Sequence, residues 1–300
     1  MAACSEPSTQ ALRIGTNVWP GYEPLYLARE LGYFNKDDIR LIEYTSASQV
    51  IKGYRNGLLD SAAVTLDEAI VLLEAGEDFR IILAMDESNG ADALLGQSFI
   101  KSIEDLRGKR IGVEHTALGA YFLYRIVELT ALDKKDITVV SQEVNQHVKA
   151  FKEKQVDAVI TFDPARSEII EYGGNVLFDS SKIPGEIVDV LIVRAEKLKL
   201  FEKNIDDLKQ AWFKAVGNIQ NNPNKYAKMI DKRMRVGEKN VMSMFDGLAF
   251  PDKEKNEFLL TSMEGKSLIR SSKKMAKIMS DNGMTDSIVD TDVMFESVVK

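Results

Sequence analysis

The sequence predicts an α/β protein built from two lobes of the same topology. Short apolar segments alternate with helical segments through about the first 195 residues, which is typical of mostly parallel sheets covered by helices. One part of this region is echoed by a second part 97 residues later. The remaining residues carry helical patterns in which no strands stand out.

Residues 13–34 are predicted to form a strand, a loop and a helix near the start of the first lobe, and the rest of the chain is expected to surround this unit. A short apolar strand leads into a loop in which Trp19 and Tyr22 flank a Pro-Gly pair. The next helix has Pro24 in its first turn, where a missing N–H costs nothing, and Gly32 just beyond its end. In open α/β sheets, small ligands bind at such corners, outside the carboxyl ends of the strands.

The other elements of the first lobe follow from the same alternation. The predicted strands cover residues 12–16, 39–44, 61–64 and 80–85, and the predicted helices cover residues 23–31, 48–56 and 67–75. Gly57 and Gly76 follow two of these helices as stop signals.

The repeat indicates the second lobe. The Arg-Ile-Gly run at Arg13 recurs at Arg110, and Asp60 recurs as Asp157, both at the offset of 97 residues. Chance agreement between two common α/β patterns is the alternative explanation. The repeat predicts strands at 110–114, 137–141, 158–161 and 175–178, and helices at 117–130, 145–154 and 164–172.

Two apolar runs with an internal Asp, at residues 89–96 and 186–193, are predicted to cross between the lobes. Lobe one would then be discontinuous, with residues 11–92 and 190–300, and lobe two would hold residues 93–189. Helical patterns at 205–221, 223–230, 238–245, 252–264 and 271–281 predict a helical C-terminal segment packed on lobe one.

The composition limits the possible functions. A net charge of −7 argues against nucleic-acid binding, which needs a basic face to replace phosphate counterions. With one Cys and two His, neither a Cys/His zinc site nor a Cys–His catalytic pair is expected. No run approaches the length of a membrane-spanning segment.

Residues 1–10 are predicted to be a disordered tether. Small residues precede Cys4, as at the end of a bacterial lipoprotein signal, where the cysteine becomes the lipidated N-terminus. A lipid on Cys4 would attach the protein to a membrane without a spanning helix. The alternative is an accidental Ala-Ala-Cys near the start of the chain.

Candidate ligand contacts in the first lobe lie at strand ends. Trp19 and Tyr22 can stack on a flat ligand or face a cation, although a buried Trp more often belongs to a core. Ser46 follows the second predicted strand as a helix cap or an anion contact. Thr65 and Asp67 follow the third strand, where helix capping and ligand contact are both plausible.

The second lobe offers matching candidates. Thr116 begins a helix of small residues that would suit an anion, after a strand that ends at Glu114 and before Tyr121. Asp163 precedes another helix start, where capping is again an alternative. His147 is expected at the surface. No catalytic constellation or nucleophile elbow is found, so enzyme activity is not expected.

The runs Ile-Gly-Thr-Asn-Val-Trp-Pro-Gly-Tyr-Glu-Pro at 14–24, Leu-Arg-Gly-Lys-Arg-Ile-Gly-Val at 106–113 and Val-Asp-Ala-Val at 156–159 carry a resemblance. They are similar to the substrate-binding proteins of nitrate, sulfonate and taurine ABC importers, a superfamily that includes binders of thiamine-pyrimidine precursors. The resemblance covers about residues 12–195. It implies a type II periplasmic-binding-protein fold, with two α/β lobes, two crossover strands and a ligand enclosed between the lobes.

The candidate contacts fit that scheme but their charge departs from it. The full set is Trp19, Tyr22, Ser46, Thr65, Asp67, Glu114, Thr116, Tyr121, Asp163 and Asp189, with Asp189 on the return crossover. An anion binder should place Arg or Lys at several of these positions, whereas this chain has acids there and at Glu23. Uncompensated carboxylates in a closed cleft favour a cationic, amine-bearing or heteroaromatic ligand. A zwitterion such as taurine could place its acid group at residues 116–119.

The resemblance also implies partners and location. It implies an extracytoplasmic, monomeric solute-binding protein, without a cofactor or metal, that delivers its ligand to an ABC permease with its ATPase. The expected location is periplasmic or at the cell surface, held to a bacterial membrane only by a lipid anchor. A ligand-sensing input protein for a membrane receptor is the alternative.

Overall fold

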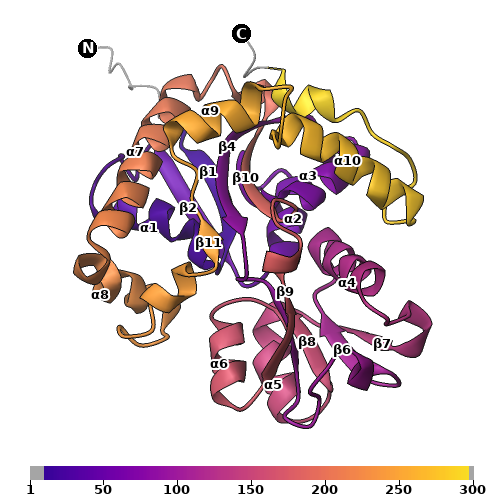
Figure 1. Cartoon of the computed structure of the whole chain (residues 1–300). Coiled ribbons are helices and arrows are strands. Elements are labelled where there is room, and N and C mark those ends of the chain that lie inside the picture. The colour runs from indigo at the N-terminus through magenta and orange to yellow at the C-terminus, as the bar shows by residue number, and fades with distance from the viewer. Residues whose placement is uncertain (1–9, 297–300) are drawn as a thin grey trace, which may run out of the picture.

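The computed structural model describes residues 10–296, in which two sheets form the centres of two lobes (Figure 1). This confirms the α/β fold predicted from the sequence. Cys4 and nearly all of the predicted tether lie outside the described residues.

The two sheets have matching strand orders. The first sheet runs β11-β4-β10-β3-β1-β2 and the second runs β7-β6-β8-β5-β9. The first sheet contains β1 (Leu12–Asn17), β2 (Ile39–Tyr44), β3 (Ser61–Thr65), β4 (Phe79–Ser88), β10 (Val188–Arg194) and β11 (Leu248–Ala249). The second contains β5 (Ala93–Gly96), β6 (Arg110–Val113), β7 (Thr138–Ser141), β8 (Ala158–Thr161) and β9 (Asn175–Asp179). In each sheet one strand that follows a crossing, β10 or β5, lies antiparallel between two neighbours.

An equivalent ion pair occurs in each lobe, at the amino ends of β1 and β6. Arg13 Nε donates to Asp60 Oδ2 at 2.8 Å, and Arg110 Nε donates to Asp157 Oδ2 at 3.1 Å. The main-chain N–H of each arginine donates to the same carboxylate oxygen. The repeat of 97 residues is therefore a structural repeat, because the same side chains tie the same pair of strands in both lobes.

Helices cover both faces of each sheet (Figure 1). The apolar sides of α1 (Glu23–Glu30), α7 (Glu202–Asn221) and α8 (Pro223–Met234) pack in one core of the first lobe. Those of α2 (Ala47–Arg55), α3 (Leu66–Glu74), α9 (Lys253–Thr261) and α10 (Leu268–Asp281) pack in the other. In the second lobe, α4 (Ala117–Leu129) lies opposite α5 (His147–Lys152) and α6 (Ala165–Glu171).

The crossings and the C-terminal region differ in detail from the prediction. The first crossing is not one continuous run, because β4 ends at Ser88, Gly90 takes a φ of 117°, and β5 starts at Ala93. The helix predicted at 238–245 is wrong. Only a 3-10 turn forms there, at Met242–Phe245, since Gly237 with a φ of 86° turns the chain after α8. The short strand β11 and the 3-10 turn Thr291–Phe295 have no strong sequence signal. The lobe limits at residues 92 and 190 stay a prediction.

The Arg13–Asp60 ion pair should contribute more to the free energy of unfolding than the Arg110–Asp157 pair. The Asp60 side chain is fully buried and Arg13 is 33% exposed, whereas Asp157 and Arg110 are 18% and 44% exposed. Asp60→Asn should lower the free energy of unfolding in urea by about 2 kcal/mol, and Asp157→Asn by less.

The acid side of the stability curve gives a second readout. Burial alone would raise the pKa of Asp60, but the bonds from Arg13 outweigh burial and lower it. The contribution of this pair is therefore present above the ordinary aspartate pKa and is lost as the pH falls through the lowered one. Equal losses in the two variants at neutral pH would contradict the difference in burial.

Candidate functional site

A cavity of about 30 Å³ lies between the two sheets. From the first lobe it is lined by Asn17, Trp19, Tyr22, Ala47, Thr65 and Glu68. From the crossings and the second lobe it is lined by Asp92, Glu114, Thr116, Leu118, Phe162 and Asp189. This volume has room for only about two water molecules, so an organic ligand can enter only when the lobes separate or side chains move.

Strand direction explains why these residues meet. Strands β1 and β3 are parallel, as are β6 and β8, and the residues just after their carboxyl ends reach the cavity. Strand β10 runs the opposite way, so Asp189 near its amino end lies at the same edge of the first sheet. The cavity is therefore the place where the carboxyl edges of the two sheets face each other, as expected for ligand sites of α/β sheets.

Aromatic side chains form one wall of the cavity. The Trp19 and Phe162 rings meet edge to face across the cleft, with centroids 5.1 Å apart and an interplanar angle of 84°. Trp19 Nε1 donates to Asp86 Oδ2 at 3.3 Å, and the Tyr22 hydroxyl donates to Asp189 Oδ1. These two hydrogen bonds hold the Trp19 and Tyr22 rings against buried acids.

The acids around the cavity are buried and incompletely paired. Asp67, Glu68, Asp86, Asp92 and Asp189 are each at most 3% exposed. Burial raises the pKa of all five, with that of Asp92 reaching about 6. Within residues 10–296, Glu68 Oε1, Asp86 Oδ1 and both oxygens of Asp67 have no hydrogen-bond partner. None of the lining side chains described above is Arg or Lys.

Direct bonds between the lobes close one end of the cleft. The Ser48 hydroxyl oxygen, at the start of α2, lies 3.1 Å from Glu114 Oε1 and 3.0 Å from Glu143 Oε2, so its single proton is shared between the two carboxylates. The main-chain N–H of Ser48 also donates to Glu114 Oε1 at 3.2 Å. Burial raises the pKa of Glu114 in spite of these bonds.

The structure brings six of the ten predicted contacts together. The residues that line the cavity are Trp19, Tyr22, Thr65, Glu114, Thr116 and Asp189. Thr116 also caps α4, because Gly119 N donates to its Oγ1 at 3.3 Å. Capping and a place in the site are thus combined in Thr116, for which the sequence predicted only an anion contact.

The other four predicted contacts lie elsewhere. Ser46 is buried with its Oγ 3.0 Å from Ser48 Oγ, and its neighbour Ala47 faces the cavity. Asp67 is buried beside the cavity, but Glu68 lines it. Asp163 serves as a cap of α6, because Ser167 N donates to its Oδ1 at 2.9 Å.

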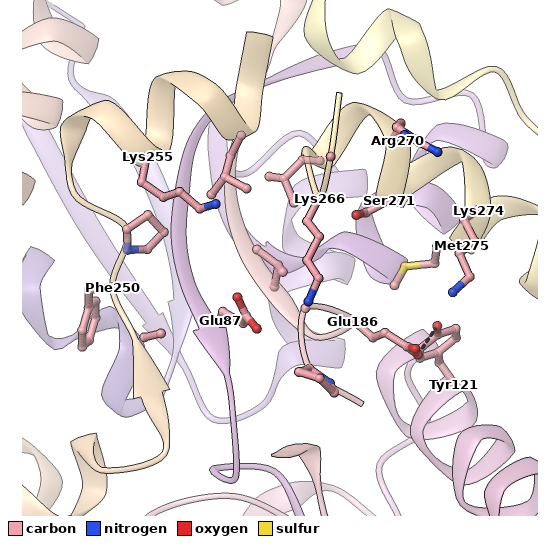
Figure 2. A pocket seen from close by; sticks show the side chains of 18 of the residues that line it. Glu87, Tyr121, Glu186, Phe250, Lys255, Lys266, Arg270, Ser271, Lys274 and Met275 are labelled. Carbon is pink, nitrogen blue, oxygen red and sulfur yellow. Dashed lines mark hydrogen bonds between the residues drawn. The ribbon is translucent and has the colours of Figure 1, made fainter. Parts of the chain in front are cut away.

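Tyr121 belongs to a different hollow, on the surface beside the return crossing (Figure 2). Its hydroxyl donates to Glu186 Oε2 at 2.8 Å, and Glu186 also accepts from Arg125. This hollow measures about 740 Å³, and exposed Lys255, Lys266, Arg270 and Lys274 stand around it. It is larger than the cleft cavity, and Glu87 and Val188, the neighbours of Asp86 and Asp189 in β4 and β10, line it.

Some residues of the site were missed by the sequence analysis. Glu68 follows Asp67 directly, so the prediction of Asp67 was one residue away. Asn17 carried no signal beyond its place at a strand end, whereas Asp92 is the internal acid of the first predicted crossing and was not assigned to the site. Asp86 lies one residue beyond the strand predicted at 80–85, next to Glu87, and the structure extends this strand to Ser88.

Two other expectations are corrected. Glu23 does not face the cavity, because Arg233 Nε donates to its Oε1 at 2.8 Å. His147 is not at the surface but 1% exposed, with Nδ1 3.1 Å from Thr161 Oγ1. Among residues 10–296, no group of His, Cys, Asp and Glu has the geometry of a metal site. In the same part of the chain, no helix has the length and apolar character needed to cross a membrane.

The matched sheets, the antiparallel strand after each crossing and the cavity between the lobes define a periplasmic-binding-protein fold. The alkanesulfonate-binding protein from Xanthomonas axonopodis pv. citri, solved bound to MOPS, aligns with a TM-score of 0.80 and 16% identity over 99% of both chains. The periplasmic aliphatic sulphonate binding protein from Escherichia coli aligns with a TM-score of 0.77 and 18% identity, over 96% of this chain and 98% of that chain. At these identities the likeness shows the fold alone.

The chain belongs to the NMT1-like family, whose model matches residues 5–231. A Bacillus subtilis (strain 168) protein, named by inference as an aliphatic sulfonates-binding protein, is 29% identical over 188 residues, 60% of this chain and 54% of that protein. The taurine-binding periplasmic protein of Escherichia coli (strain K12) is 22% identical over 230 residues, 70% of this chain and 72% of that protein. The chain thus spans about half of the first relative. Both are named as binding proteins, which agrees with the expectation that this chain is not an enzyme.

Removing the Ser48 hydroxyl should favour the open form. Ser48→Ala deletes the bonds to Glu143 and one of the two bonds to Glu114, and should shift the closed-to-open ratio about fivefold, or about 1 kcal/mol. A larger radius of gyration in small-angle X-ray scattering would report the shift. Ser98→Ala, at an exposed position, is the control, and an unchanged radius in Ser48→Ala would show that these bonds do not hold the lobes together.

Proposed function

We propose that this chain is an extracytoplasmic solute-binding protein that captures a small organic molecule between its lobes and delivers it to an ABC importer. The periplasmic-binding-protein fold, the family match and the names of both relatives support this role. The partner would be an ABC permease with its ATPase, which recognises the closed protein. Neither the net charge of −7 nor the lining of the cavity gives a reason to propose a nucleic-acid partner, a cofactor or a metal.

Closure of the two lobes would be the mechanism of capture. The moving bodies would be residues 11–92 with 190–300, and residues 93–189. A ligand that contacts both bodies shifts the open–closed equilibrium by its preference for the closed state. The small volume of the cleft cavity supports this mechanism, because entry requires separation of the lobes.

The ligand is proposed to be cationic, amine-bearing or heteroaromatic. The observation that carries this proposal is the lining of the cavity, where Glu68, Asp92, Glu114 and Asp189 surround the aromatic wall. A positive or hydrogen-bond-donating group would satisfy carboxylate oxygens that otherwise remain buried and unpaired. Trp19 and Phe162 would hold a flat or cationic group by stacking or through their ring faces.

A sulfonate or taurine-like ligand is the second candidate. The names of both relatives favour it, and the N-terminus of α4 offers main-chain N–H groups to an acid group. A zwitterion would place its amine at the carboxylates and its acid group at this helix end. A sensory role, with a membrane receptor in place of the permease, uses the same cleft.

The cellular location is proposed from the same comparisons. The protein would be periplasmic or at the cell surface, monomeric, and held to a membrane by a lipid on Cys4. Membrane fractionation of cells that express the protein from its own gene, with Cys4→Ser as the matched variant, tests the anchor. Loss of membrane association in the variant is expected.

Titration calorimetry with a charge-varied panel tests the ligand class. The panel contains methanesulfonate, taurine, putrescine and 4-aminopyrimidine, and native mass spectrometry of the purified protein supplies any compound carried through purification. Amines should bind, and methanesulfonate should not. Binding restricted to anions would refute the proposed ligand class.

Trp19→Ala should weaken binding of any panel ligand about tenfold or more, because it removes the aromatic surface that faces the cavity. Trp19→Phe should lose less, since it keeps the ring but not the bond to Asp86. Tyr172→Ala, at a 53% exposed position, is the control. Unchanged affinity and stability in Trp19→Ala would remove Trp19 from the site.

A further inference from the structure

Two buried acids lie side by side in the first sheet, at the edge that faces the cavity. Asp86 on β4 and Asp189 on β10 are direct partners in the antiparallel register, and Asp189 pairs with Thr65 on its other side. Directly opposite residues of an antiparallel pair point to the same face, about 5 Å apart at Cβ. Asp86 is 0% exposed and Asp189 is 3% exposed, so water cannot screen one carboxylate from the other.

The contacts of the pair do not supply a positive charge. Asp189 accepts from the Tyr22 hydroxyl and Asp86 Oδ2 accepts from Trp19 Nε1, both neutral donors. Asp86 Oδ1 lacks a hydrogen-bond partner within residues 10–296. Around the pair, the titratable groups are Tyr22 from the loop after β1, Asp67 and Glu68 from α3, Asp92 from the crossing, and Glu114 after β6.

A cation beside Asp92 faces another acid and not the pair. Nη1 of Arg166 on α6 lies 3.7 Å from Asp163 Oδ2. The charge of Arg166 also lowers the pKa of Asp92, although burial raises it more. Two like charges in direct opposition inside a sheet are unfavourable, and two carboxylates that share a dry site cannot both ionise.

We propose that Asp86 and Asp189 share one proton when the cleft is closed without ligand, and that the positive group of the ligand binds at this pair and displaces that proton. The ligand half of the proposal rests on the proposed function, whereas the shared proton does not. The proton is held between the two carboxyl groups and leaves to solvent when a cation takes its place. The bond that breaks is the O–H bond of the protonated carboxyl group: its electron pair stays on the carboxylate oxygen, and water accepts the proton.

The electrostatics agree with this arrangement. Burial raises the pKa of Asp86, and burial together with the Asp86 charge raises that of Asp189. A carboxyl group whose pKa is raised in the folded chain binds more protons there than in the unfolded chain. Stability of the ligand-free protein should therefore fall as the pH rises from about 4, the ordinary aspartate value, through neutral pH.

The shared proton is tested on the ligand-free protein by carboxyl-carbon NMR with isotope-labelled aspartate. The pair should titrate in two macroscopic steps, one of them above neutral pH. Asp86→Asn and Asp189→Asn should each abolish the upper step and leave one carboxyl that titrates lower. Asp206→Asn, at an exposed position of α7, should keep both steps.

In the unmodified protein with isotope-labelled aspartate, the infrared carbonyl band of a protonated aspartate should be present at neutral pH, and its absence would overturn the proposal without any variant. This measurement keeps the test decisive if a variant does not fold. Ionisation of both carboxyl groups at neutral pH would overturn the proposal.

The ligand half is tested by calorimetry of putrescine in buffers of different ionisation enthalpy. Binding should release about one proton. At pH values below the upper step, the affinity should therefore increase up to about tenfold for each unit by which the pH is raised. Asp86→Asn should remove this dependence. Binding without proton release, or no binding of putrescine, overturns the ligand half. Binding of anions alone would refute the proposed function, while the NMR titration judges the shared proton separately.

Discussion

The insertion of β10 between β3 and β4 is the constraint on which the site depends. The chain leaves the first lobe after β4, builds the second lobe, and returns as an antiparallel strand in the middle of the first sheet. Because this strand runs opposite to its neighbours, its amino end brings Asp189 beside Asp86 and Thr65. The same insertion ties the two lobes through the centre of a sheet, so their relative position depends on a short connecting region. β5 has the equivalent place in the second sheet.

Local signals in the sequence were sufficient for the architecture and for part of the site. Pro-Gly punctuation located Trp19 and Tyr22, and the recurrence of Arg13 and Asp60 at Arg110 and Asp157 located the second lobe. The choice between Asp67 and Glu68 could not be made, because one residue along a helix turns the side chain by about 100°. Contacts between residues far apart in the chain could not be predicted from the sequence either. Arg233 pairs with Glu23 and Glu186 binds Tyr121 only because tertiary packing brings them together.

Architecture and ligand chemistry are separable in this family. The fold positions the strand ends, and that property persists at 16% identity to a sulfonate binder. The charge at those strand ends depends on a few individual side chains, which can change without any effect on the sheets. An acidic lining in a fold shared with sulfonate binders therefore requires no change in how the lobes move, only in what they hold.

The bonds of Ser48 to Glu114 and Glu143 run from lobe to lobe and require no bridging molecule. Part of the free energy of closure thus belongs to the protein itself, and some molecules will adopt the closed shape with only water inside. A membrane partner that recognised shape alone would engage these molecules too, and an ATPase coupled to it would turn over without cargo. Efficient uptake would then demand that the partner distinguish a filled cleft from an empty one, or that empty closure be rare.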